Sequence, residues 1–182
     1  LDPVLVEIEN WDEGKFEEIE LENHPNHPEL GMRTVRFGKR AYIEREDFAE
    51  VPPNKFFRLK PEGEVRLKGA YIIKCTGWEA KDDGTITKIH CTYDPTSKSG
   101  EDARKVKGTL HWVNADDAVK AEFRLYETLL KSEVSGADEA EEEEEAVEKD
   151  FVDKLNPDSL VTLHGFVEPA LGGSAAGERF QF

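Results

Sequence analysis

Short stretches of alternating apolar and polar residues recur along most of the chain, and this pattern predicts β-strands rather than long helices. Each stretch is rich in β-branched and aromatic residues and is bounded by Pro, Gly, Asn or Asp, which favour turns. Short strands at this spacing are typical of barrels or sandwiches. The stretches are PVLVEIEN (3–10), AYIEREDF (41–48), EVRLKGAYIIKC (64–75), TITKIHCTY (85–93), GTLHWV (108–113) and SLVTLHGFVE (159–168).

Three local features refine this pattern. The sequence KDDG at 81–84 predicts a hairpin, because Asp83-Gly84 can supply the positive φ that a tight turn needs. The stretch AEFRLYETLL (121–130) fits either a strand or a helix, and we favour the strand. The stretch DFVDKLNPDSL (150–160) predicts a short helix that stops before Pro157, whose ring disfavours continuation.

The charge of the chain is concentrated in one segment. The formal net charge is −16, and the segment 133–150 has ten acidic residues and one lysine, which leaves only −7 for the rest. Like charges with little apolar surface to bury predict a disordered, solvated insertion, and a protein-docking segment is the alternative. The remaining residues are hydrophobic enough to form a core.

The sequence shows no catalytic motif and no strong metal-binding motif. It has no GxSxG, HExxH, GxxxxGK[ST] or GxGxxG pattern. His24 and His27 are three residues apart, but no further ligands converge with them in the sequence. Cys75 and Cys91 form no CxxC pattern, which favours free core thiols and a reducing cytoplasm. The sequence also predicts neither a membrane span nor a signal peptide.

Basic and aromatic residues are interleaved near the middle of the chain. Such a mixture suits a single-stranded RNA loop, because bases stack on aromatic rings while cations neutralise phosphates and donate to base edges. The alternative is a solvated strand face beside core aromatics. The basic residues are Lys55, Arg58, Lys60, Arg66, Lys68 and Lys74, the aromatic ones are Phe56, Phe57 and Tyr71, and Arg33, Arg36, Lys39, Arg40 and Arg45 lie just upstream.

Arg66 and Lys68 are two residues apart in a predicted strand. Side chains alternate along a strand, so these two residues and Glu64 share one face while Val65 and Leu67 share the other. We therefore expect Arg66 and Lys68 to lie on the solvent face, where removing the Arg66 side chain would leave folding nearly unchanged.

Several strings together resemble the C-terminal anticodon-binding region of the glutaminyl-tRNA synthetase family. They are EVRLKGAYIIKC, IHCTYDP, KVKGTLHWV, AEFRLYETLL, NPDSL and GFVEPAL, in the family's order, and the resemblance covers almost the whole chain. It implies a mostly β fold of two six-stranded β-barrels with short helices, a type shared with a 5S-RNA-binding ribosomal protein. We expect the first barrel at 1–115 and the second at 116–182, incomplete at its C-terminus, with the disordered acidic insertion at 133–150.

The resemblance also implies a set of anticodon contacts. Arg66 and Lys68 match positions at the first anticodon base, Lys55 and Arg58 match positions around the third, and Asn26 matches a contact near the base of the anticodon loop. His164 stands beside the middle base, where many relatives carry glutamine. Lys68 is usually arginine in relatives, so it offers a point charge in place of a planar fork.

The resemblance also implies a binding partner, a cellular location and an activity of the parent protein. The expected partner is the anticodon loop of glutamine tRNA, with no DNA, no membrane, a monomeric state and a cytoplasmic location. The chain is expected to be a fragment without cofactor and without activity alone, whose parent ligates glutamine to its tRNA with ATP in a catalytic domain outside it. The alternatives are a β-barrel that binds ribosomal RNA and a protein-interaction module that acts through the acidic segment.

Overall fold

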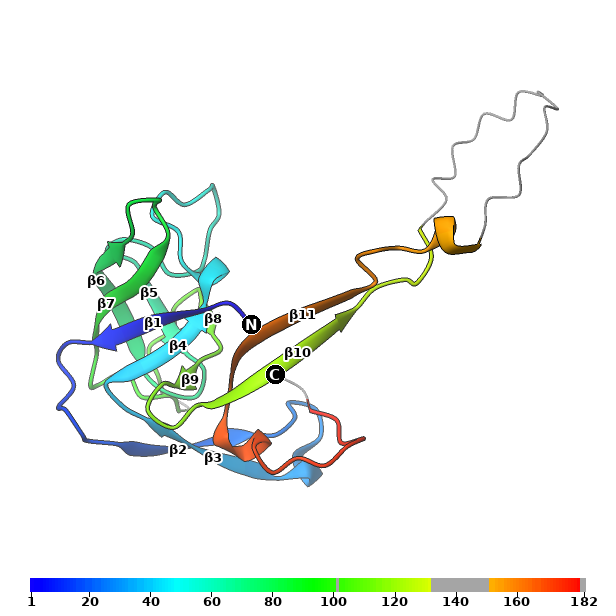
Figure 1. The fold of residues 1–182 in the computed structure, drawn as a ribbon. Coiled ribbons are helices and arrows are strands. Elements are labelled where there is room, and N and C mark those ends of the chain that lie inside the picture. Colours follow the sequence, from blue (N-terminus) through cyan, green and yellow to red (C-terminus); the bar gives the residue numbers. More distant parts are fainter. Residues whose placement is uncertain (101, 132–150, 181–182) are drawn as a thin grey trace. The chain divides into compact units, whose positions relative to one another are not determined.

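The fold is mostly β, as the sequence predicts. The computed structural model describes residues 1–100, 102–131 and 151–180, and its strands are joined by turns and four short 3-10 helices (Figure 1). The strands are β1 (Pro3–Ile8), β2 (Glu17–Glu22), β3 (Met32–Phe37), β4 (Arg40–Glu44), β5 (Glu64–Leu67), β6 (Ile72–Ala80), β7 (Ile86–Tyr93), β8 (Thr109–Leu110), β9 (Val113–Asn114), β10 (Val119–Tyr126) and β11 (Leu160–Val167). The 3-10 helices are η1 (Pro28–Leu30), η2 (Arg45–Asp47), η3 (Phe151–Lys154) and η4 (Pro169–Leu171).

Seven strands form one curved sheet in the order β8-β5-β6-β7-β1-β4-β9 (Figure 1). Neighbouring strands are antiparallel except for the parallel pairs β1–β7 and β5–β8. Alternation decides which side chains reach the core: Val4, Val6 and Ile8 of β1 are buried, whereas the residues between them are only partly covered.

A separate antiparallel pair, β2–β3, adds to the same core. Ile19 and Leu21 are buried, while Glu18, Glu20 and Glu22 face solvent and Glu18 lies opposite Arg36 in the register. These strands are not among the stretches predicted above, because charged residues occupy every second position and leave only two large apolar residues in β2.

Aromatic side chains occupy the centre of the core. Phe37 is fully buried, and its ring centroid lies 4.8 Å from that of Trp11 and 5.4 Å from that of Trp112, both with edge-on geometry. Tyr71 and Tyr93 complete the group, at 5.3 and 6.4 Å from Phe37. Edge-on pairs at these distances stabilise a core beyond the area that they bury.

The hairpin predicted at 81–84 is confirmed. β6 and β7 are antiparallel, Gly84 has φ 82°, and its amide donates to the carbonyl of Lys81 at 2.9 Å. Cys75 and Cys91 face each other across this hairpin as buried free thiols. The Cys75 contact and burial both raise the pKa of Cys91, so this thiol stays protonated.

The ambiguous stretch 121–130 contributes to a strand. β10 pairs with β11, and η3 ends at Lys154, before Pro157, as the proline rule predicts. The described chain forms two compact units, Leu1–Ala121 with Gly165–Phe182, and Glu122–His164.

The expectation of two six-stranded barrels is not confirmed. In the part of the chain that the structure describes, the strands are distributed as one sheet of seven and two pairs, and the large sheet is open rather than closed. The barrel boundary at 115 stays a prediction. The expected disorder of 133–150 concerns residues outside the described ranges.

Candidate nucleic-acid interface

β5 sets the direction of Arg66. Val65 and Leu67 are fully buried, whereas Arg66 is partly exposed on the opposite face with Glu64. The alternation inferred from the sequence is therefore confirmed for this strand. It decides the face of the sheet on which Arg66 lies, but not the contacts that its guanidinium makes there.

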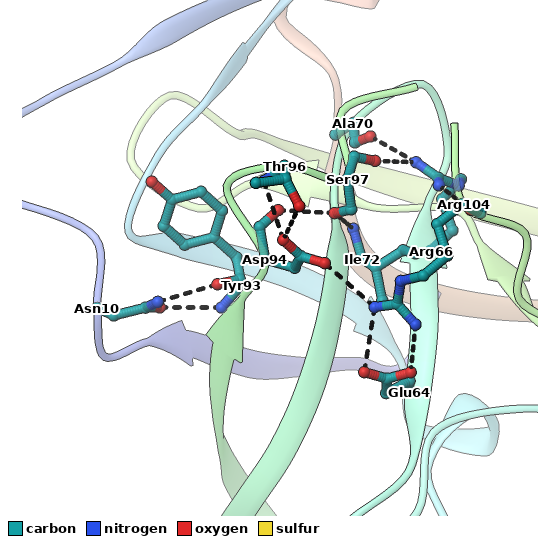
Figure 2. A network of polar contacts seen from close by, with 10 residues as sticks. All are labelled: Asn10, Glu64, Arg66, Ala70, Ile72, Tyr93, Asp94, Thr96, Ser97 and Arg104. Atoms are coloured by element: carbon teal, nitrogen blue, oxygen red, sulfur yellow. Dashed lines mark hydrogen bonds and ion pairs between the residues drawn. The ribbon is translucent and has the colours of Figure 1, made fainter. Parts of the chain in front are cut away.

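The guanidinium of Arg66 holds a distant segment in place (Figure 2). Its Nη1 donates to the carbonyls of Ala70 (3.0 Å) and Ser97 (2.7 Å) and to the hydroxyl of Ser99 (3.0 Å), and its Nη2 donates to the carbonyl of Arg104 (2.7 Å). Arg66 therefore lies on the expected face of the strand, but its guanidinium is held by four acceptors that the alternation of the strand does not predict. The segment after β7 folds back over β5 and supplies acceptors that no local pattern reveals.

Arg104 and Arg66 differ in how their charges are balanced. Arg104 forms ion pairs with Glu64 at 2.7 Å and with Asp94 at 3.2 Å (Figure 2). Its hydrogen bond to Glu64 raises the pKa of Arg104 and lowers that of the Glu64 carboxyl. The four acceptors of Arg66, by contrast, are neutral, and no carboxylate of the described residues forms an ion pair with it.

Lys68 lies just beyond the end of β5. Its amide donates to the carbonyl of Leu110, and its own carbonyl accepts a hydrogen bond from Nε1 of Trp112 at 3.0 Å. The backbone is thus fixed while the ammonium makes no hydrogen bond or ion pair with the described residues. Burial lowers the pKa of the nearby His111, and the positive charge of Lys68 adds to that effect.

Lys55 and Arg58 belong to the loop between η2 and β5 and differ in their contacts. Lys55 is exposed, has φ 64° and makes no side-chain hydrogen bond or ion pair with the described residues. Arg58 pairs with Glu46 at 3.0 Å and with Asp47 at 3.4 Å. Burial raises the pKa of the Asp47 carboxyl, and the charge of Arg58 partly offsets this effect.

Asn26 and His164 lie in different compact units. Asn26 is exposed in a turn, where its backbone amide donates to Nδ1 of His24 at 3.1 Å. His164 projects from β11, with 77% of its side chain exposed, and lies 4.0 Å from a carboxylate oxygen of Glu122.

Two adjacent hollows bring Arg58 and Arg66 to one region of the surface. The first, of about 350 Å³, is lined by Arg66, Arg104, Lys105, Ser99, Thr109 and others, and we call it the cationic pocket. The second, of about 220 Å³, is lined by Phe56, Phe57, Arg58, Lys60, Lys107 and others, and we call it the aromatic pocket. Val106 lines both, so the pockets are neighbours.

The segment 104–108 forms part of both pockets, and the sequence reasoning did not include it among the site residues. The ammonium of Lys107 lies 5.2 Å from the ring centroid of Phe57, within cation–π range. A glycine is required at position 108 because the backbone there lies close to that of Phe57, and a Cβ would lie 1.9 Å from the carbonyl oxygen of Phe57. The run of basic residues Arg104, Lys105 and Lys107 is the signal that could have identified the segment.

The five basic residues between positions 33 and 45 do not join this interface as free cations. Each of these five residues forms an ion pair with a carboxylate. The pairs are Arg33–Glu168, Arg36–Asp117, Lys39–Glu13, Arg40–Glu13, Arg40–Asp116 and Arg45–Asp2. Arg33 and Glu168 also line a third hollow of about 650 Å³ with mostly apolar walls.

Two negative results apply to the described residues. No group of three or more His, Cys, Asp or Glu side chains among residues 1–100, 102–131 and 151–180 is arranged to hold a metal ion. In the same ranges, no helix has the length and apolar composition that crossing a membrane requires.

Comparison with known proteins places this geometry in context. Two family models, both described as the anticodon-binding domain of class I tRNA synthetases (E and Q), match residues 1–94 and 109–182. The chain is 47% identical to a glutamine-tRNA ligase of Clostridium kluyveri, 46% identical to one of Clostridium perfringens and 47% identical to one of Rhodopirellula baltica. Each match covers the whole chain but only 30–32% of the relative, so the chain spans about a third of their length.

Proposed function

The chain belongs to the anticodon-binding domains of the class I tRNA synthetases for glutamate and glutamine, and from this premise we propose that it binds the anticodon loop of a glutamine tRNA. The full-length protein would then ligate glutamine to that tRNA with ATP, in a domain outside this chain. It would do so in the cytoplasm as a monomer, without binding DNA. We also propose that the strands close into two barrels in the full-length protein.

The observation that carries this proposal is the pair of neighbouring pockets. An unstacked base needs an aromatic or guanidinium plane, and its phosphate needs a cation close by. Phe57 is half exposed beside Arg58 and Lys107, although large aromatic rings are usually buried. The adjoining cationic pocket supplies Arg66 and Lys105. A solvated strand face would not need both pockets side by side.

The remaining site residues are proposed by resemblance to the family. Arg66 and Lys68 would serve the first anticodon base, Lys55 and Arg58 the third, His164 the middle base and Asn26 the base of the loop. The proposed roles of Lys68 and Lys55 are supported by their ammonium groups, which have no hydrogen-bond or ion-pair partner among the described residues. To contact RNA, Arg58 would have to break its ion pair with Glu46 or with Asp47.

The acidic body is compatible with this role. Net charge governs non-specific affinity and encounter, whereas discrimination comes from fixed donors in pockets, where a wrong base leaves a donor unpaired at about 1–3 kcal/mol. The carboxylates paired with the upstream arginines limit the basic surface to the pockets and their neighbours. We therefore propose that the negative charge suppresses binding to other RNAs.

Replacing Phe57 tests the stacking surface. In the full-length protein, Phe57→Ala should weaken tRNA binding by about 1–3 kcal/mol, the usual contribution of one stacked base. Folding should change little because half of the side chain is exposed. Affinity is measured by filter binding with glutamine tRNA, and Phe180→Ala, at a similarly exposed ring outside these pockets, is the control. Unchanged affinity of Phe57→Ala would remove the aromatic pocket from the interface.

Replacing Lys68 tests the ionic contact. Lys68→Ala should reduce tRNA affinity by about 1 kcal/mol and flatten its dependence on salt, because the ammonium is without a partner in the described protein. Lys68→Arg should keep or improve binding, since a guanidinium can donate in pairs. Lys81→Ala, at an exposed lysine of the β6–β7 turn, is the matched control. Equal affinities for all four proteins would exclude Lys68 from the site.

A further inference from the structure

The cationic pocket has an excess of positive charge in a chain that is strongly acidic. Arg66, Arg104 and Lys105 line it together with the hydroxyl residues Ser99 and Thr109, and no carboxylate is among its described lining residues. Glu64 and Asp94 balance Arg104 from outside the pocket. The charges of Arg66 and Lys105 have no such partner within the described ranges.

Arg66 is also preorganised. Four hydrogen bonds to neutral acceptors fix its guanidinium, so its orientation needs no further ordering when a ligand arrives. A guanidinium has five N–H donors, and its Nε makes no hydrogen bond with the described residues. Arg66 is partly buried and has no counter-ion among the described residues, and such a cation attracts an anion more strongly than an exposed one because solvent screens it less.

The lining of the pocket distinguishes a phosphate from a base. Recognition of a splayed base requires a flat surface for stacking, and no aromatic residue is among the described lining of the cationic pocket. The aromatic pocket next to it has Phe56 and Phe57, and the two share Val106. Cations and hydroxyl groups without a stacking surface are suited to phosphate oxygens.

We propose that the cationic pocket binds a phosphate group of the RNA backbone, with Lys105 supplying a mobile charge and Arg66 a fixed one. This rests on the proposed function and refines it, since Arg66 then holds the backbone of the loop instead of reading the edge of the first base. The neighbouring aromatic pocket receives the base of an adjacent nucleotide.

The test uses Lys105, whose side chain is exposed and makes no hydrogen bond or ion pair with the described residues, so we expect its removal to change folding little. In the full-length protein, Lys105→Ala should weaken binding of glutamine tRNA about five- to tenfold at low salt and lower the slope of log affinity against log salt by about 0.7, the value for one phosphate contact in a single strand. Lys105→Arg should restore both quantities, and Lys81→Ala serves as the surface-lysine control.

A second measurement locates the contact. Anticodon stem-loop RNAs that carry one neutral methylphosphonate each are compared for binding to the wild type and to Lys105→Ala. If the pocket holds a phosphate, neutralising one position should weaken wild-type binding and leave the binding of Lys105→Ala almost unchanged, because the same contact is already lost.

The outcomes separate this inference from the proposed function. Tight binding of the wild type together with an unaltered affinity of Lys105→Ala would overturn the phosphate pocket alone. So would a Lys105→Ala protein that keeps its salt slope but discriminates less between glutamine tRNA and tRNAs altered in the anticodon, because that result indicates a base contact. Failure of the wild type to bind any of these RNAs would overturn both.

Discussion

Arg33→Ala should lower the free energy of unfolding by about 3–5 kcal/mol, the range found when one partner of a buried ion pair is removed. Nε and Nη2 of Arg33 donate to the two carboxylate oxygens of Glu168 at 2.5 and 3.0 Å. The Glu168 side chain is only 4% exposed, so the substitution would leave a desolvated charge without its partner. Nη1 of Arg33 also donates to the carbonyl of Glu22 at 2.8 Å, and the substitution would remove this hydrogen bond as well.

Urea denaturation followed by tryptophan fluorescence measures this effect, because Trp11, Trp78 and Trp112 all lie in the unit that contains the pair. Lys74→Ala is the control: Lys74 pairs with Glu62 on the surface, and its loss should change stability little. The double substitution Arg33→Met with Glu168→Leu should cost less than Arg33→Ala, since it removes both charges. If Arg33→Ala lost less unfolding free energy than Lys74→Ala, the Arg33–Glu168 pair would not stabilise the unit.

Arg66→Ala should reduce both stability and RNA affinity. Its guanidinium donates to Ala70, Ser97, Ser99 and Arg104, and the substitution would leave the carbonyls of Ser97 and Arg104 without this donor, so we expect a loss of about 2–4 kcal/mol of unfolding free energy. This replaces the expectation, drawn from strand alternation alone, that folding would be nearly unchanged.

The Ser97–Arg104 segment should respond most strongly. Ser97 is 1% exposed, and its hydroxyl accepts from the amide of Ile72 at 2.8 Å and donates to the carbonyl of Asp94 at 2.7 Å. Hydrogen exchange of the amides of Ile72 and Ser97 should therefore accelerate in Arg66→Ala. Arg66→Lys keeps the charge but cannot span the same acceptors, so it should recover RNA affinity more than stability. Wild-type exchange and wild-type stability in Arg66→Ala would contradict the assigned contacts.

Local chemistry was sufficient for many elements of the fold. The turn at Gly84 depends on positive φ, and the end of η3 before Pro157 depends on the proline ring. β2 was harder to predict because only Ile19 and Leu21 provide an apolar face. The numbers of strands in each sheet were not predictable, because pairing joins strands that are far apart in the sequence, as in the parallel pair β1–β7.

The site divides in the same way. The sequence by itself determined that Arg66 lies opposite Val65 and Leu67, because the two-residue period of a strand is local, and its family strings determined which proteins the chain resembles. Only the tertiary structure decided that the guanidinium of Arg66 binds the Ser97–Arg104 segment and that Arg33 is neutralised by a glutamate 135 residues away. Hydrogen bonds and ion pairs of long side chains depend on which distant segments the fold brings within about 3 Å, and no local period encodes that distance.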